Sequence, residues 1–237
     1  MKLTTPIYRL KRQARVLSRK ESIPLHEALD RMAHAEGFGS WSLLAAKYSV
    51  ETPAQKLYAQ LQPGDIALVA ARPNQGKTLL SLELAVEAMK FGHRSTFFSL
   101  EFTLRDCDEA FRSIEVDPSR FAELFEFDGS DGIDADHIEK QMTDAPQGSF
   151  AVIDYLQLLD QRRESPPLTD QVRSLRHFAR QKGFILAFIS QVDRSYDTAV
   201  KSCPDLGDVR LPNPLDLTLF DRACFINGDE IQIRAAS

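Results

Sequence analysis

The sequence has few of the features that mark a secreted or membrane protein. Its 237 residues include three cysteines, Cys107, Cys203 and Cys224, which are widely spaced and never form a C-x-x-C pair. An odd, scattered set argues against a disulfide framework and against a structural zinc site. No apolar run approaches the roughly 20 residues of a membrane span, and the first 20 residues lack the apolar core of a signal peptide. We therefore expect a cytoplasmic protein with reduced cysteines and no membrane partner.

The charge of the chain is unevenly divided. The composition is that of an ordinary globular protein, with 43% hydrophobic and 27% charged residues. Residues 1–50 hold 9 Lys/Arg against 4 Asp/Glu, a net of +5, and the remainder holds 20 against 30, a net of −10. This separation predicts a basic unit that faces an anionic partner or the acidic body of a neighbouring subunit.

Residues 1–50 are expected to form a small basic unit of three helices. Apolar residues recur at helical spacing over 6–20, and the chain from Lys2 to Lys20 carries seven Lys/Arg and no acid. A second helix is predicted after Ser22, and Ser40 is expected to cap a third. A basic three-helix unit is typical of a nucleic-acid module. A unit that docks on a protein fits as well, and the sequence leaves both open.

Residues 71–78 give the strongest functional signal. They read A-R-P-N-Q-G-K-T and lie between the apolar run 66–70 and an apolar segment with helical character. A buried strand, a tight loop and a helix start in this order form a P-loop, whose backbone N–H groups bind phosphate. We expect Lys77 to contact the β- and γ-phosphates and the Thr78 hydroxyl to hold Mg²⁺. The predicted nucleotide-binding residues are Ala71, Arg72, Pro73, Asn74, Gln75, Gly76, Lys77 and Thr78.

The P-loop pattern usually begins with Gly, and this chain has Ala71 in that place. The alternative is therefore an ordinary strand–loop–helix corner in which Lys77 only caps the turn.

Polar residues also follow three later apolar runs. Glu101 follows the run 97–100, Asp154 follows 150–153, and Gln191 comes shortly after 184–189. Carboxyl ends of parallel strands meet at one edge of a sheet, so we expect these side chains to lie near the P-loop. An apolar strand that ends in Asp has the Walker B form, in which the carboxylate holds Mg²⁺. For Glu101, an ordinary surface glutamate is the alternative.

Two further features are predicted near the C-terminus. Residues 192–216 are expected to form a long irregular loop, which in a compact domain is usually functional or disordered. The runs 223–226 and 230–233 flank Asn227 and Gly228, a pair typical of a β-hairpin with a type I′ turn.

With these motifs in place, residues 58–234 resemble the RecA-like ATPase domain of replicative DnaB-type helicases. The matching segments are QPGDIALVAARPNQGKT, FFSLE, VIDYLQLL, QVRSLRHFARQKG and ISQVDRS. The resemblance implies an α/β, RecA-like P-loop NTPase fold over residues 51–237, with a mainly parallel sheet flanked by helices and a C-terminal β-hairpin. The P-loop of that family also commonly opens with Ala.

The resemblance also implies roles for individual residues. Lys77, Glu101 and Gln191 would be catalytic: Glu101 activates the attacking water, and Gln191 senses the γ-phosphate of ATP. Thr78 and Asp154 would hold Mg²⁺. The segments after Asp154 and Gln191 match loops that face nucleic acid. The expected contacts to single-stranded DNA, with solvated loop charges as the alternative, are Arg162, Arg163 and Arg194.

The expected function is that of an Mg²⁺-dependent ATPase that acts on DNA as a helicase or remodelling enzyme, with a homo-oligomer as a possible assembly. Two departures from the family favour a second hypothesis. The basic tail that supplies Lys/Arg fingers to a neighbouring subunit is reduced here to Arg234, and the family's helical N-terminal domain is replaced by residues 1–50. The second hypothesis is a nucleotide-gated assembly or binding protein of the RecA/KaiC type, with little turnover and no strand separation.

Overall fold

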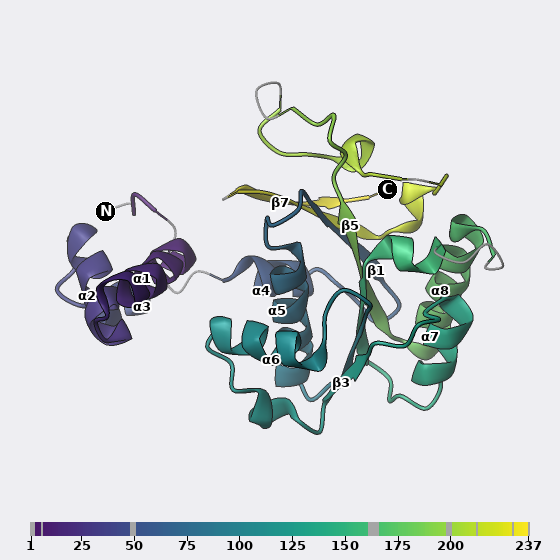
Figure 1. Ribbon diagram of the computed structural model, residues 1–237, viewed down its shortest axis with the longest axis horizontal. Helices are drawn as coiled ribbons and strands as arrows, with labels where there is room; N and C mark the ends of the chain where they lie inside the picture. Colours follow the sequence, from purple (N-terminus) through teal and green to yellow (C-terminus); the bar gives the residue numbers. More distant parts are fainter. Residues whose placement is uncertain are drawn as a thin grey trace. The chain divides into compact units, whose positions relative to one another are not determined.

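The chain divides into two compact units, Met1–Thr52 and Pro53–Ser237 (Figure 1). The computed structural model describes residues 3–5, 7–47, 51–160, 166–197, 201–211, 213–228 and 230–236. Each unit has an apolar core of its own. Over these described ranges, no helix is long and apolar enough to cross a membrane.

The first unit consists of the helices α1 (Ile7–Glu21), α2 (Leu25–Ala35) and α3 (Trp41–Lys47). The buried residues of its core are Ile7, Leu10, Ala33 and Leu44, and Trp41 packs partly buried against them. The start of α3 is capped, because the Leu43 N–H donates to Ser40 Oγ at 3.4 Å. The predicted cap at Ser40 is therefore present.

A seven-stranded sheet in the order β3-β2-β4-β5-β1-β6-β7 forms the centre of the second unit. Neighbouring strands from β3 to β6 run parallel, and β7 pairs antiparallel with β6. The prediction of a mainly parallel sheet with a C-terminal hairpin is confirmed. The strands are β1 (Ile66–Ala71), β2 (Ser95–Ser99), β3 (Phe125–Asp128), β4 (Phe150–Asp154), β5 (Ile185–Gln191), β6 (Arg222–Asn227) and β7 (Glu230–Ala235).

Helices cover both faces of this sheet, with α4 (Pro53–Tyr58), α5 (Lys77–Lys90) and α6 (Leu104–Ser113) on one face and α7 (Ala135–Met142) and α8 (Leu168–Lys182) on the other (Figure 1). Every side chain of β1 is buried, and successive side chains point alternately into the two cores. Burial on both faces explains why β1 reads as a continuous apolar run. Short 3-10 helices complete the unit: η1 (Pro118–Phe121), η2 (Leu156–Asp160), η3 (Leu206–Asp208) and η4 (Leu217–Leu219).

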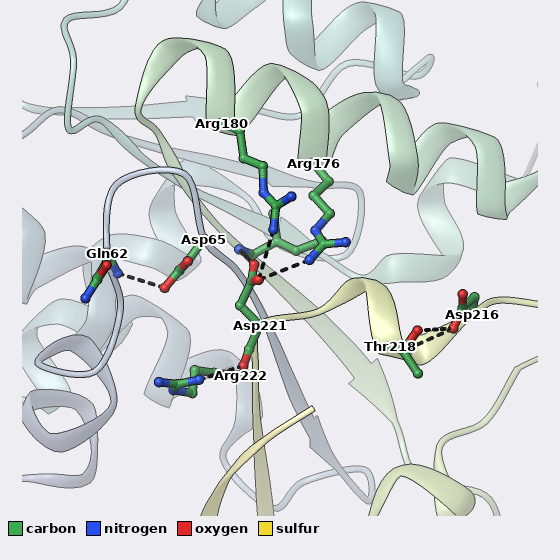
Figure 2. A network of polar contacts seen from close by, with 9 residues as sticks. Gln62, Asp65, Arg176, Arg180, Asp216, Thr218, Asp221 and Arg222 are labelled. Atoms are coloured by element: carbon green, nitrogen blue, oxygen red, sulfur yellow. Dashed lines mark hydrogen bonds and ion pairs between the residues drawn. The ribbon is translucent and has the colours of Figure 1, made fainter. Parts of the chain in front are cut away.

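Asp221 ties three segments together at the amino ends of the strands (Figure 2). Its Oδ2 accepts the Ile66 N–H at 2.9 Å. Its Oδ1 lies 3.2 Å from Arg176 Nη2 and 3.4 Å from Arg180 Nη2, both on α8. This carboxylate therefore fixes the start of β1 against α8 and against the start of β6, at the end of the sheet opposite the P-loop.

Two expectations about strand ends are wrong. The register pairs Asn227 with Glu230, so Asn227 is the last residue of β6 and not a central turn residue. Its side chain donates to the Ser202 carbonyl at 2.7 Å, which holds it in the strand.

The second error concerns β2, which ends at Ser99 and not at residue 100. Ser99 Oγ accepts the N–H groups of Glu101 and Phe102 at 3.1 and 3.0 Å, and these bonds turn the chain out of the sheet. Although β2 follows β1 along the chain, β4 and β5 separate the two strands in the sheet.

Candidate functional site

The loop between β1 and α5 has the form that phosphate binding requires. Ala71 is the last residue of β1, and α5 begins at Lys77. Gly76 precedes the helix with a φ of 85°, a conformation that favours glycine. Because Gly76 has no side chain to cap the helix, the first N–H groups of α5 are left for another acceptor. Such a helix start attracts anions.

Segments that follow the two strands beside β1 hold the P-loop in place. The Arg72 guanidinium lies 5.2 Å from the centroid of the Tyr196 ring and donates to the Tyr196 carbonyl. Gln75 Oε1 accepts the Gly228 N–H at 2.7 Å. Tyr196 comes after β5 and Gly228 comes after β6, the neighbours of β1. The residues at the tip of the loop, Pro73 and Asn74, are exposed.

Asp154 is a buried carboxylate at the end of β4. The residue is 1% exposed, and Oδ1 has no hydrogen-bond partner among the residues that the structure describes. Burial raises the pKa of Asp154 to about 7, and the charge of Lys77 opposes this shift. The charge of Glu101 raises the pKa further, while a hydrogen bond from Thr78 lowers it. The peptide bond between Asp154 and Tyr155 is cis. The structure thus brings the predicted residues Lys77, Thr78, Glu101 and Asp154 together.

The pair formed by Thr78 and Asp154 fits a divalent cation. A hydroxyl and a carboxylate with an unpartnered oxygen supply the hard ligands that Mg²⁺ prefers, and Mg²⁺ usually keeps several waters and takes few protein ligands. Elsewhere in the described ranges, no group of three or more His, Cys, Asp or Glu could hold a metal ion.

Glu101 is held by its backbone. Its N–H bonds to Ser99, which pairs in register with Asp154. Two residues later, Thr103 and Asp106 form a reciprocal cap at the start of α6. The turn is therefore fixed on both sides, and the residue itself is exposed. This arrangement presents the carboxylate at the same sheet edge as Asp154.

Gln191 ends β5 and pairs in register with Ala71. Arg210 contacts it twice: the Arg210 N–H donates to the Gln191 carbonyl at 2.7 Å, and Arg210 Nη1 lies 3.4 Å from Gln191 Oε1. Gln157, on η2 after Asp154, donates to the Arg210 carbonyl at 2.9 Å. Sequence reasoning did not assign Arg210 to the site, because the contact depends on an isolated bridge between Val192 and Val209 within a segment that shows no periodicity.

The basic residues predicted to contact nucleic acid are only partly described. Arg194 is exposed, in a turn where the Ser195 N–H donates to Asp193 Oδ1 at 2.8 Å. Arg162 and Arg163 lie outside the described residues. Arg234, on β7, is exposed and donates to Gln232 Oε1.

The sheet order, the helices on both faces and the P-loop define the class of protein, an α/β protein with the fold of RecA-like P-loop ATPases. No protein-family model matches the chain. The replicative DNA helicase DnaB of Mycoplasma genitalium is 28% identical over 199 residues, which cover 67% of this chain and 42% of that protein. The chain therefore spans less than half the length of this curated relative.

Solved structures with the same fold include an isolated ATPase domain and a DnaB-like helicase. The ATPase domain matches with a TM-score of 0.57 and 17% identity over 77% of this chain and 80% of that chain. The DnaB-like replicative helicase, solved in a study of its interactions with primase, matches with a TM-score of 0.57 and 16% identity over 96% and 73%. A KaiC-like protein from the archaeon Pyrococcus horikoshii gives 0.52 and 14% over 73% and 79%. The resemblance to the RecA-like ATPase domain of DnaB-type helicases is confirmed.

Proposed function

We propose that this protein is an Mg²⁺-dependent ATPase that acts on DNA. One observation carries the proposal: a buried Asp154 with an unpartnered oxygen lies beside Thr78, at the uncapped start of α5. A helix N-terminus accepts phosphate, and the two oxygen ligands suit Mg²⁺. Together they suit a nucleoside triphosphate with its metal ion.

The chain's own residues would divide the chemistry between them. The N–H groups at the start of α5 and the Lys77 ammonium bind the phosphates, and Thr78 and Asp154 hold the metal ion. Bound Mg²⁺ neutralises charge that develops on the transferring phosphoryl group. Glu101 orients a water molecule and accepts its proton as the oxygen bonds to the γ-phosphorus. The bond from the γ-phosphorus to the bridging oxygen breaks, which leaves ADP and phosphate.

Gln191 would couple this reaction to DNA. It ends β5, and the segment after it carries Arg194 and the Tyr196 contact to the P-loop. A change at the γ-phosphate would therefore reach a basic, exposed segment through Gln191 and Arg72. Arg194, with Arg162 and Arg163, would contact single-stranded DNA, and the homologous helicase supports this assignment.

ATP turnover measured with and without single-stranded DNA tests the proposal. We expect DNA to stimulate turnover in the wild type, and we expect Lys77→Ala and Glu101→Gln each to abolish it. Loss of one charge-stabilising group costs on the order of 100-fold or more in rate. The matched control is Lys90→Ala, which lies on the same helix and pairs with Glu87. Turnover that survives both site substitutions would contradict the proposal.

One observation favours the alternative of a nucleotide-gated assembly or binding protein. Arg234 is the only basic residue after the hairpin turn, and its guanidinium bonds to Gln232 on its own strand. A site without a basic group from a neighbour would turn over slowly. Light scattering with and without ATP separates the two functions, because a gated assembly changes mass on binding ATP even in the Glu101→Gln variant.

A further inference from the structure

The exposed face of α1 is a cationic stripe. Positions i, i+1, i+4, i+7 and i+8 of a helix share one face, and from residue 12 onward all five such positions are exposed. The opposite face holds the buried Ile7, Leu10 and Ala14. The first acidic residue of α1 is Glu21, its last residue. This α1 stripe consists of Arg12, Gln13, Val16, Arg19 and Lys20.

The acidic residues of the first unit are engaged away from the stripe. Glu21 and Glu27 both pair with Arg31 on α2, at 2.6 and 2.9 Å. Asp30 Oδ1 accepts the Trp41 N–H at 2.7 Å, and Glu36 accepts the Thr4 N–H at 2.8 Å. These are all four Asp/Glu of residues 1–50.

No acid of the unit is therefore left to neutralise the stripe. In the part of the chain that the structure describes, the side chains of Arg12, Arg19 and Lys20 have no partner. The net charge of +5 on residues 1–50 is thus concentrated on a free surface.

We propose that the α1 stripe binds the sugar–phosphate backbone of DNA. Arg12 and Arg19 are two helical turns apart, about 10 Å along the axis, a length over which duplex DNA presents several phosphates. Guanidinium groups bind phosphate with two parallel hydrogen bonds, and the Gln13 amide is a further donor of the kind that contacts phosphate and sugar.

The composition of the stripe favours nucleic acid over a protein partner. Charged residues are depleted at the core of protein interfaces, which are anchored by large aromatic side chains. The only apolar residue of the stripe is Val16, and Trp41 packs against the core of the unit. Without an exposed aromatic side chain for base stacking, the stripe recognises the backbone and not the sequence. This binding site is independent of the ATP site.

Titration of labelled DNA into the full chain tests the proposal. The probes are an oligothymidylate and a mixed-sequence duplex, each bound over a series of salt concentrations. In the variant Arg12→Gln/Arg19→Gln/Lys20→Gln, we expect the slope of log K against log salt to fall by about 2–3, since each lost phosphate contact contributes about 0.7–0.9. Affinity at low salt falls by at least ~10-fold for the same reason.

A matched control removes the same charge from exposed positions of the second unit: Lys56→Gln/Arg105→Gln/Arg173→Gln. This variant keeps the wild-type slope, and so does the charge-preserving Arg12→Lys/Arg19→Lys. Circular dichroism verifies the fold of each variant. An equal slope in the stripe variant and the control variant overturns the proposal. A change in mass by light scattering without a change in DNA affinity also overturns it and assigns the stripe to protein docking.

The outcome is separable from that of the ATPase proposal. The stripe variant keeps DNA-independent ATP turnover, whereas Lys77→Ala keeps the salt dependence that the stripe contributes.

Discussion

Asp154 is a carboxylate that the fold buries while one of its oxygens remains without a hydrogen bond in the described part of the chain. A buried charge without full pairing costs free energy, so the protein alone gains nothing from keeping it there. Strongly shifted carboxylates are characteristic of functional sites. At the residue scale, therefore, the arrangement is explained by a cation that completes it.

The first prediction concerns the stability of the Asp154→Asn variant in metal-free buffer. Burial raises the pKa of Asp154 from 3.8 to about 7, so between these values the folded protein holds a proton that the unfolded chain has released. Wild-type stability consequently falls as pH rises from about 4 to about 7 and is level above that. The variant lacks this fall. Above pH 7 we expect it to be more stable than the wild type by up to about 4 kcal/mol.

Denaturant unfolding over this pH range measures the difference. Parallel pH profiles for the two proteins would mean that Asp154 is not buried in its charged form.

At the scale of elements, the end of β5 is joined to a distant segment. Arg210 bonds to the backbone of Gln191 and approaches its side chain, and Gln157 closes the group from η2. The 3-10 helix that follows β4 and the residue that ends β5 are thus tied to one irregular segment. This connection gives the segment a route to the site.

The second prediction is that Arg210→Ala lowers DNA-stimulated ATP turnover, by up to ~100-fold if Gln191 is misplaced by about 1 Å. We expect the Km for ATP to change little, because Arg210 contacts Gln191 and Gln157 and not the phosphate-binding loop. Arg173→Ala, which removes an exposed arginine of α8, is the control. Equal stimulation in the two variants would show that Arg210 does not position Gln191.

The third prediction concerns Asp221, at the other end of the sheet (Figure 2). Asp221→Ala leaves the Ile66 N–H without its acceptor and Arg176 without its partner, and we expect a loss of about 2–3 kcal/mol in unfolding free energy. Asp221→Asn keeps an acceptor and should lose about half as much. The control Asp216→Ala removes only an exposed cap of η4, worth about 1 kcal/mol.

Chemical denaturation of the three variants tests this order. A loss for Asp221→Ala no larger than that for Asp216→Ala would remove Asp221 from the packing of β1 against α8.

The local pattern predicts some of these features well and misses others for physical reasons. Buried parallel strands read as apolar runs that end in a polar residue, so the ends of β4 and β5 are predictable from sequence. The end of β2 is not, because the Ser99 hydroxyl turns the chain early. The hairpin register depends on the bond from Asn227 to Ser202, and the Gln75–Gly228 bond spans 153 residues. Contacts of this range leave no mark in a local pattern.

At the scale of the whole molecule, the two units have separate cores. The first depends on a small cluster that includes Ile7, Leu10, Ala33 and Leu44, and a core of this size gives marginal stability. The buried clusters on the two faces of the sheet belong to the second unit alone. Among the described residues, neither core contains residues of the other unit.

The fourth prediction follows from this separation. A chain reduced to Pro53–Ser237 is expected to unfold in one cooperative transition, with a Tm close to that of the same unit in the full chain. The first unit should melt at lower temperature. Calorimetry of the two chains measures both. A reduced chain that fails to fold would show that the second unit depends on the first.

The most direct measurement is equilibrium binding of ATP to the wild type and to Lys77→Ala, with and without Mg²⁺, using Lys90→Ala as the control. Lys90 ends the same helix and pairs with Glu87. We expect the wild type and the control to bind ATP and to bind it more tightly with Mg²⁺, while Lys77→Ala loses ATP binding. If Lys77→Ala binds ATP as the wild type does, the loop before α5 is not a nucleotide site.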